Sequence, residues 1–133
     1  MPSLDTNILV RYVVRDDRAQ LGAARRLIRS CVSRGQTLLV PVTVALELEW
    51  VLRSNFGFSK VQAIDPLSDL FSTAELTFES ERALEVAPHL YREGSAGFAD
   101  CADVALAAQA CELPLWTFDK RAGKVNGARI LGR

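Results

Sequence analysis

Four acidic side chains occupy comparable positions in the predicted secondary structure, although they are far apart in the chain. Each follows a predicted strand or lies in the first turns of a predicted helix; they are Asp5, Glu47, Asp100 and Asp119. Carboxylates gathered in one place repel one another, so such a cluster needs protons, basic partners or a cation. Oxygen ligands without His or Cys favour Mg²⁺ or Mn²⁺, ions that activate water and stabilise phosphoryl oxygens. The four acids therefore predict a metal site suited to phosphoryl chemistry.

The elements that would position these acids alternate between strands and helices. Strands are predicted near residues 3–5, 38–42, 75–78, 115–118 and 129–131, and helices near residues 8–14, 18–33, 43–55, 80–93 and 98–111. A further helix is predicted from Ser59, where Ser59 and Gln62 suit a capping box, with an interruption or restart near Pro66. This alternation predicts an α/β fold with a parallel sheet between helices, formed by one domain over residues 1–133. Ligands bind such sheets at the carboxyl ends of the strands, so we expect all four acids at that edge.

Small polar residues next to the acids are predicted to support the site. Thr6, Asn7 and Thr117 could orient water molecules bound to a metal. On the helix predicted from residue 98, Asp103 is rotated by about 60° from the line through Asp100, so we expect it to tune the site from outside.

Helical periodicity also separates two neighbouring glutamates. On the helix predicted from residue 43, Glu47 borders the apolar stripe and should be directed toward the sheet edge. Glu49 is predicted to point away from the stripe and to form an exposed ion pair with Arg53.

Composition and charge narrow the class of protein. The chain has 133 residues, 16 basic and 16 acidic side chains and a single histidine, His89, which disfavours an imidazole-based zinc site or a Ser-His-Asp triad. Its three cysteines lack C-x-x-C spacing and are predicted to be reduced, buried thiols. No apolar stretch suits a membrane span and no signal peptide is visible, so a cytoplasmic location is expected. Basic residues suited to phosphate contacts are Arg11, Arg15, Lys120, Arg121 and Lys124.

Four sequence blocks resemble the successive motifs of PIN-domain nucleases, in order and over almost the whole chain. The blocks are LDTNILVRYVVRDD, PVTVALELEWVLR, FADCADVALAAQA and LWTFDKRAGKV. Within that family the chain is most similar to VapC-type toxins of bacterial toxin–antitoxin pairs. The resemblance implies a three-layer α/β/α sandwich with a central parallel sheet of about four to five strands. It also implies a Mg²⁺-dependent endoribonuclease restrained by a VapB-like antitoxin, and a homodimer to which Phe56, Phe58 and Phe71 could contribute. By motif position, the family's acids fall on Asp5, Glu47, Asp100 and Asp119.

Two alternatives remain open. A haloacid-dehalogenase-like phosphohydrolase also begins with an Asp after its first strand, but it needs a second acid two residues later, where this chain has Asn7. A catalytically silent module could retain the fold and bind RNA or a protein without cleaving it. The silent module predicts RNA binding that does not respond to Mg²⁺.

Overall fold

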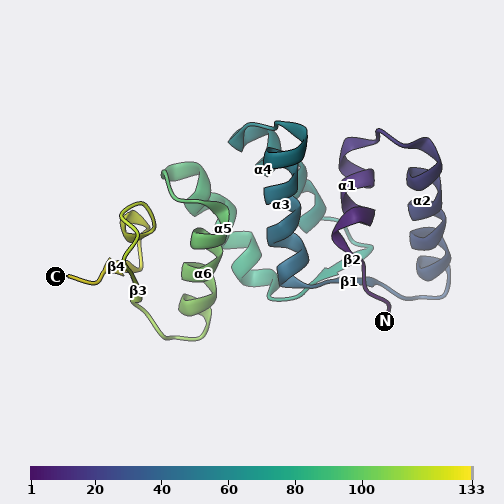
Figure 1. Cartoon of the computed structure of the whole chain (residues 1–133). Helices are drawn as coiled ribbons and strands as arrows, with labels where there is room; N and C mark the ends of the chain where they lie inside the picture. Colours follow the sequence, from purple (N-terminus) through teal and green to yellow (C-terminus); the bar gives the residue numbers. More distant parts are fainter. Residues whose placement is uncertain (133) are drawn as a thin grey trace. The chain divides into compact units, whose positions relative to one another are not determined.

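The computed structural model describes residues 1–132. The chain divides into two compact units, one over residues 1–79 and one that begins at Ser80. Figure 1 shows the helices and strands of both. The first contains α1 (Thr6–Val14), α2 (Arg18–Ser33), β1 (Leu38–Val40), α3 (Val42–Phe56), α4 (Lys60–Phe71) and β2 (Leu76–Phe78). The second contains α5 (Glu81–Glu93), α6 (Phe98–Gln109), β3 (Leu115–Thr117), the short 3₁₀ helix η1 (Ala122–Lys124) and β4 (Ala128–Ile130).

Parallel pairing in the first unit joins three segments that are distant in the chain. β1 and β2 pair in parallel, with Leu38 opposite Leu76 and Val40 opposite Phe78. On the other edge of β1, Ser3 forms a parallel bridge with Leu39. The segment before α1 therefore lies beside β1 through an isolated bridge instead of the predicted strand, and Asp5 follows it at the start of α1.

The helices of the first unit begin and end at residues that suit helix termini. Asp17 caps α2 by accepting a hydrogen bond from the Gln20 amide at 3.0 Å. Ser59 and Gln62 form a capping box at the start of α4. Gly57 ends α3 in the left-handed conformation, with φ of 68°, which glycine adopts without strain. The apolar side chains buried between these elements include Leu9, Leu38, Leu48, Leu52, Ile64 and Leu67.

The second unit combines a helix pair with a small parallel sheet. α5 and α6 pack closely, and the rings of Tyr91 and Phe98 meet edge to face with centroids 5.4 Å apart. β3 pairs in parallel with β4, with Trp116 opposite Arg129 and Thr117 opposite Ile130. The loop between these strands contains η1, which contacts both of them.

The α/β class and the parallel pairing agree with the prediction, but a sheet of four to five strands is not confirmed. Residues 1–132 contain two sheets of two strands each, β1 with β2 and β3 with β4. Other details differ. α4 runs through Pro66 without interruption, and Cys111 is exposed, whereas Cys31 and Cys101 are buried. None of the described helices is both long enough and apolar enough to cross a membrane.

One of the aromatic residues expected at a dimer surface belongs to the core instead. Phe71 is buried and packs edge to face against Phe78, with ring centroids 4.9 Å apart. It is the last residue of α4, shortly before β2. Phe56 and Phe58 are only partly exposed.

Candidate active site

Asp5 is the residue at which the first strand segment gives way to α1. Its backbone is extended, and its carboxylate Oδ1 accepts a hydrogen bond from the Thr6 amide at 2.7 Å. A short polar side chain at this position satisfies one of the free amides at the start of the helix. The side chain is nevertheless exposed, so the second carboxylate oxygen can still accept a ligand. Asp5 thus both begins the helix and presents a carboxylate to solvent.

A hydrogen bond between side chains links the start of α1 to α3. Thr6 is only 3% exposed, and its hydroxyl donates to Oε1 of Glu47. Glu47 itself is exposed. A hydroxyl held by its packed surroundings restricts the rotamers of the carboxylate that accepts from it. Asp5, Thr6 and Glu47 therefore form a connected group within the first unit.

The prediction that Glu49 is exposed is wrong, whereas the predicted ion pair with Arg53 is present. Glu49 does pair with Arg53 one turn later, with Arg53 Nη2 at 3.1 Å from Oε1, but its side chain is 2% exposed. The helix begins at Val42 rather than Thr43, and its buried face is broad enough to include Glu49 beside Ala45, Leu48 and Leu52. Helical periodicity predicted an exposed position for Glu49 because its side chain is charged. The ion pair with Arg53 allows the side chain to be buried.

On α6, two acids lie close enough to influence each other. Asp100 is in the first turn and partly exposed, near the position where α6 begins after Gly97. The pKa of Asp103 is raised by partial burial and, to a smaller extent, by the negative charge of Asp100. An acid that is harder to ionise is a weaker metal ligand than its neighbour. Asp103 therefore lies close enough to Asp100 to be affected by its charge.

Asp119 is held in a tight turn directly after β3. Its amide donates to the Thr117 hydroxyl at 3.0 Å, and its Oδ1 accepts from the amides of Ala122 and Arg121 at 3.0 and 2.8 Å. These bonds from Ala122 and Arg121 lower the pKa of Asp119, because they favour the ionised carboxylate. Thr117 thus fixes the turn that positions Asp119.

The predicted site residues fall into separate groups, each within one unit. Asp5, Thr6 and Glu47 are connected in the first unit; Asp100 and Asp103 are neighbours in the second, where Asp119 occupies its own turn. Asn7 is exposed beside this first group. Across residues 1–132, no three His, Cys, Asp or Glu side chains form a group that could hold a metal.

The predicted phosphate-binding residues differ in the contacts that their side chains already make within the protein. Arg11 is already engaged, because its guanidinium pairs with Asp16 at 2.8 Å. Arg15 is exposed at the end of α1 and bonds to the carbonyl of Tyr12. In the second unit, Arg121 and Lys124 line a pocket of about 180 Å³ between the loop before α6 and the loop after β3. Its other polar lining residues include Ser95, Asn126 and one acid, Glu93.

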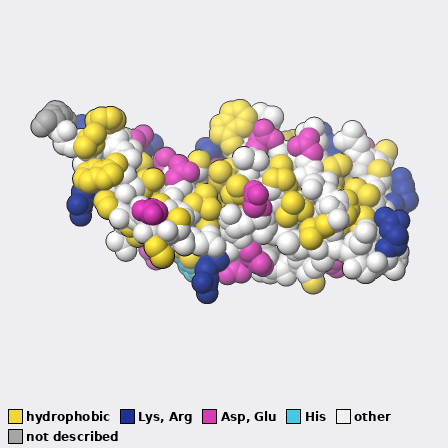
Figure 2. All heavy atoms as spheres, turned by 90° about the horizontal axis from the view of Figure 1, so that it is seen from below, with side chains coloured by type: hydrophobic (Ala, Val, Ile, Leu, Met, Phe, Trp, Pro, Cys, Tyr) yellow, Lys and Arg dark blue, Asp and Glu magenta, His cyan; other side chains and the backbone are white. Residues whose placement is uncertain are grey.

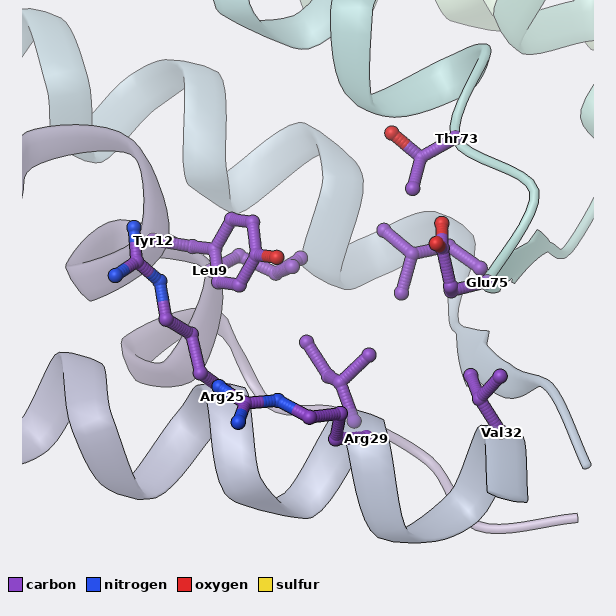
Figure 3. Close-up of a pocket in the computed structure, with 9 residues that line it drawn as sticks. Leu9, Tyr12, Arg25, Arg29, Val32, Thr73 and Glu75 are labelled. Atoms are coloured by element: carbon purple, nitrogen blue, oxygen red, sulfur yellow. The ribbon is translucent and has the colours of Figure 1, made fainter. Parts of the chain in front are cut away.

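Two hollows in the first unit border the pair of helices α1 and α2. One has a volume of about 320 Å³ and begins beside Asn7; its largely apolar lining includes Ile8, Ala24 and Leu27. The other, of about 310 Å³, is drawn in Figure 3. There Tyr12 of α1 and Arg25 and Arg29 of α2 face Thr73 and Glu75 of the segment that follows α4.

Comparison with known families gives a single clear result. Residues 3–128 match the PIN domain, and the chain therefore belongs to the PIN domain family. No curated protein matches the chain. PIN domains are generally nucleases that act on RNA or other nucleic acids and typically bind divalent metals. Membership of this family decides against the dehalogenase-like alternative, and the matched region contains all the acids described above.

Proposed function

We propose that this protein is a metal-dependent endoribonuclease that uses Asp5, Glu47, Asp100 and Asp119 to hold Mg²⁺ or Mn²⁺. The observation that carries the proposal is the link from buried Thr6 to Glu47 beside the capping Asp5. The bond gives the two acids of the first unit a fixed relation at the end of a strand segment, where α/β folds bind ligands. An exposed glutamate that had only a structural role could be solvated by water and would not need a hydrogen bond from a buried hydroxyl.

The chemistry of the donor set fits a hard divalent cation. All four candidate ligands are carboxylates, and three of them, Asp5, Glu47 and Asp119, are exposed. Oxygen donors of this kind suit Mg²⁺ and Mn²⁺, whereas Zn²⁺ sites commonly use His or Cys. When bound, the metal would supply positive charge for the phosphate oxygens and a more acidic water.

The remaining residues have roles that follow from their contacts. The turn of Asp119 keeps that carboxylate ionised through the amides of Arg121 and Ala122, and Thr117 holds the turn. Thr6 positions Glu47, and Asp103 tunes Asp100. Lys120, Arg121 and Lys124 are exposed in the same loop and would bind the phosphates of RNA on either side of the cleaved bond.

Both units must then contribute acids to one site. We further propose that the parallel strands of both units belong to the four- to five-stranded sheet of a three-layer sandwich, within one domain. Such a sheet would bring the residues that follow its strands to a common edge.

We also propose that the protein is a VapC-type toxin that acts in the cytoplasm as a homodimer and is restrained by a VapB-like antitoxin. The apolar hollow between α1 and α2, which begins beside Asn7, supports this view. An amphipathic segment of a partner could lie in it and deliver a basic side chain to Asp5 and Glu47. A partner that bound tightly but left RNA cleavage at full rate would contradict such inhibition.

The shared site is tested by measuring Mn²⁺ binding with isothermal titration calorimetry. Asp5→Asn in the first unit and Asp119→Asn in the second should each weaken binding by at least about tenfold. The matched controls, Asp69→Asn and Glu85→Gln, change exposed acids outside the proposed site and should leave the affinity unchanged. If changes in only one unit weaken binding, the two units do not share the metal.

The silent-module alternative makes the opposite prediction about metal. Such a module would bind RNA equally well with and without Mg²⁺ and would release no cleaved product. The exposed carboxylates of Asp5, Glu47 and Asp119 would only repel the RNA backbone if no cation were bound, which argues against this alternative. Sequencing the 5′ ends of RNA after induced expression distinguishes the two and identifies the RNA that is cut.

A further inference from the structure

One pocket of the second unit lies between two loops that each lead to an acid of the proposed metal site. Its first wall, residues 94–96, runs into Gly97 and then α6, whose first turn holds Asp100. A Cβ built on Gly97 would lie 3.6 Å from Oδ2 of Asp100, so this carboxylate is close to the end of that wall. The second wall begins at Arg121, whose amide donates to Asp119 at 2.8 Å. Each wall is therefore continuous with a segment that holds a proposed metal ligand.

The pocket is small and combines apolar and cationic side chains. Its volume is about 180 Å³, and its apolar side chains are Leu90, Ala96 and Val125, of which Ala96 and Val125 are buried. Arg121 and Lys124 line it and are exposed. Figure 2 shows Lys and Arg side chains among hydrophobic ones in the part of the chain that carries β3, η1 and β4. Sites for drug-sized ligands have volumes of about 300–1,000 Å³, so this smaller pocket suits a single planar group such as one base.

The acid in the lining separates a phosphate site from a nucleotide site. Glu93 lines the same pocket as the two cations and is exposed. A carboxylate would weaken a site for phosphate alone, because like charges repel. A nucleotide carries an anionic phosphate that suits the cations and a base whose N–H groups suit a carboxylate. The mixed charges of the lining therefore favour a nucleotide.

Among the RNA bases, guanine matches a carboxylate best. An ionised carboxylate only accepts hydrogen bonds, and its two oxygens can accept side by side. Guanine is the one RNA base whose Watson–Crick edge presents two adjacent donors, the ring N–H and the 2-amino group. That edge is free in an unpaired base and occupied in a duplex. Ser95 and Asn126, the other polar side chains of the lining, can bond the remaining polar atoms of the nucleotide.

We propose that this pocket holds one unpaired guanosine nucleotide of the RNA, next to the bond that is cut. The base lies against Leu90 and Val125 with its Watson–Crick edge on Glu93, and Arg121 and Lys124 meet its phosphate. The inference rests on the proposed function, because it takes RNA as the substrate, and it adds a base preference at one position. The preference comes from Glu93, which is not among the proposed metal ligands.

Two short unpaired RNAs that differ only in one amino group test this preference. One carries a single guanosine among uridines, and in the other that guanosine is replaced by inosine, which keeps the ring N–H but lacks the 2-amino group. Fluorescence anisotropy measures their affinity in EDTA, where metal-dependent cleavage is prevented, for the full-length wild type, Glu93→Gln and Glu85→Gln. Glu85 is exposed on the same helix, α5, about two turns earlier, and does not line the pocket, so its variant is the matched control.

The wild type and Glu85→Gln should bind the guanosine RNA about tenfold or more tightly than the inosine RNA, because inosine lacks one hydrogen bond to a charged acceptor. In Glu93→Gln the two affinities should differ by less than about threefold, because glutamine has only one acceptor oxygen. Lys124→Ala should weaken both RNAs about equally and reduce the salt dependence of binding, because a phosphate contact does not distinguish bases. Circular dichroism checks that each variant is folded.

Three results in EDTA would overturn the inference: equal affinity of the wild type for both RNAs, an unchanged preference in folded Glu93→Gln, or no binding of either RNA. With Mg²⁺, cleavage should occur at a bond next to the guanosine. Metal-dependent cleavage spread evenly along the uridines would also overturn the inference, while leaving the proposed function standing. A guanosine preference that depends on Glu93, without any metal-dependent cleavage, would instead contradict the nuclease proposal and support the pocket.

Discussion

The buried hydroxyl of Thr6 donates a hydrogen bond to Glu47, joining the residue that follows the capping Asp5 to an acid more than forty positions later. Thr6 is packed and cannot turn toward solvent, so its hydroxyl selects one orientation of a carboxylate that is otherwise exposed.

Thr6→Val should therefore reduce activity without unfolding the protein. Valine keeps the shape of threonine but removes the donor, which frees Glu47 to adopt other rotamers. We expect single-turnover RNA cleavage to fall by about 10- to 100-fold, as for other supporting partners of metal ligands. Thr6→Ser retains the hydroxyl and is the control. Equal rates for the Val and Ser variants would show that the bond has no role in the reaction.

Glu47 and Glu49, two residues apart on α3, should respond in opposite ways to the same change. Glu47→Gln should lower the cleavage rate by at least about 100-fold with little effect on stability. Glu49→Gln removes the charge of a buried acid that pairs with Arg53, so it should lower the free energy of unfolding by about 1–3 kcal/mol. Its cleavage rate, measured where it is fully folded, should change less than about threefold. Urea denaturation and single-turnover kinetics separate the two effects, and the reverse pattern would remove Glu47 from the site.

Asp103→Asn should raise stability at neutral pH while reducing activity. The pKa of Asp103 is raised in the folded state, mainly by burial, so ionising it as the pH rises costs stability. The neutral amide avoids that cost. We expect a higher Tm than wild type at pH 7 and a difference that disappears well below the ordinary pKa of 3.8, where the carboxyl is protonated in both states. Cleavage should fall by about 10- to 100-fold. A higher Tm that persisted at acid pH would show that the stabilisation does not come from removing the ionisation of Asp103.

The basic loop after Asp119 should determine how strongly RNA binding depends on salt. Replacing Lys120, Arg121 and Lys124 together by Ala should weaken binding and reduce the slope of log affinity against log salt. The expected reduction is at most about one unit for each lost phosphate contact. Arg11 is already paired with Asp16, so Arg11→Ala serves as a comparison that should alter the slope less. An unchanged slope in the triple variant would show that these residues are only solvated.

Local features were predictable from the sequence because they depend on nearby residues. The cap at Asp17, the capping box of Ser59 and Gln62, and the end of α3 at Gly57 each follow from hydrogen bonds or conformations within a few positions. Parallel pairing was also predictable, because strands separated by helices rarely pair otherwise.

Features that depend on distant packing were not predictable in the same way. The burial of Glu49 depends on the breadth of the face that α3 packs against its neighbours, and that of Phe71 depends on Phe78 across the turn into β2. The bond from Thr6 to Glu47 joins two helices, so no local pattern reveals it.

The most direct test of the proposed chemistry is single-turnover cleavage of RNA by wild type and Asp5→Asn, each with saturating Mg²⁺ and with excess EDTA. Asparagine can still cap α1, so the variant should stay folded, and its Tm without metal should hold or rise slightly as carboxylate repulsion is lost. We expect cleavage only by the wild type and only with Mg²⁺. Cleavage at full rate in EDTA, or by Asp5→Asn, from protein free of other nucleases would contradict a metal site built on these carboxylates.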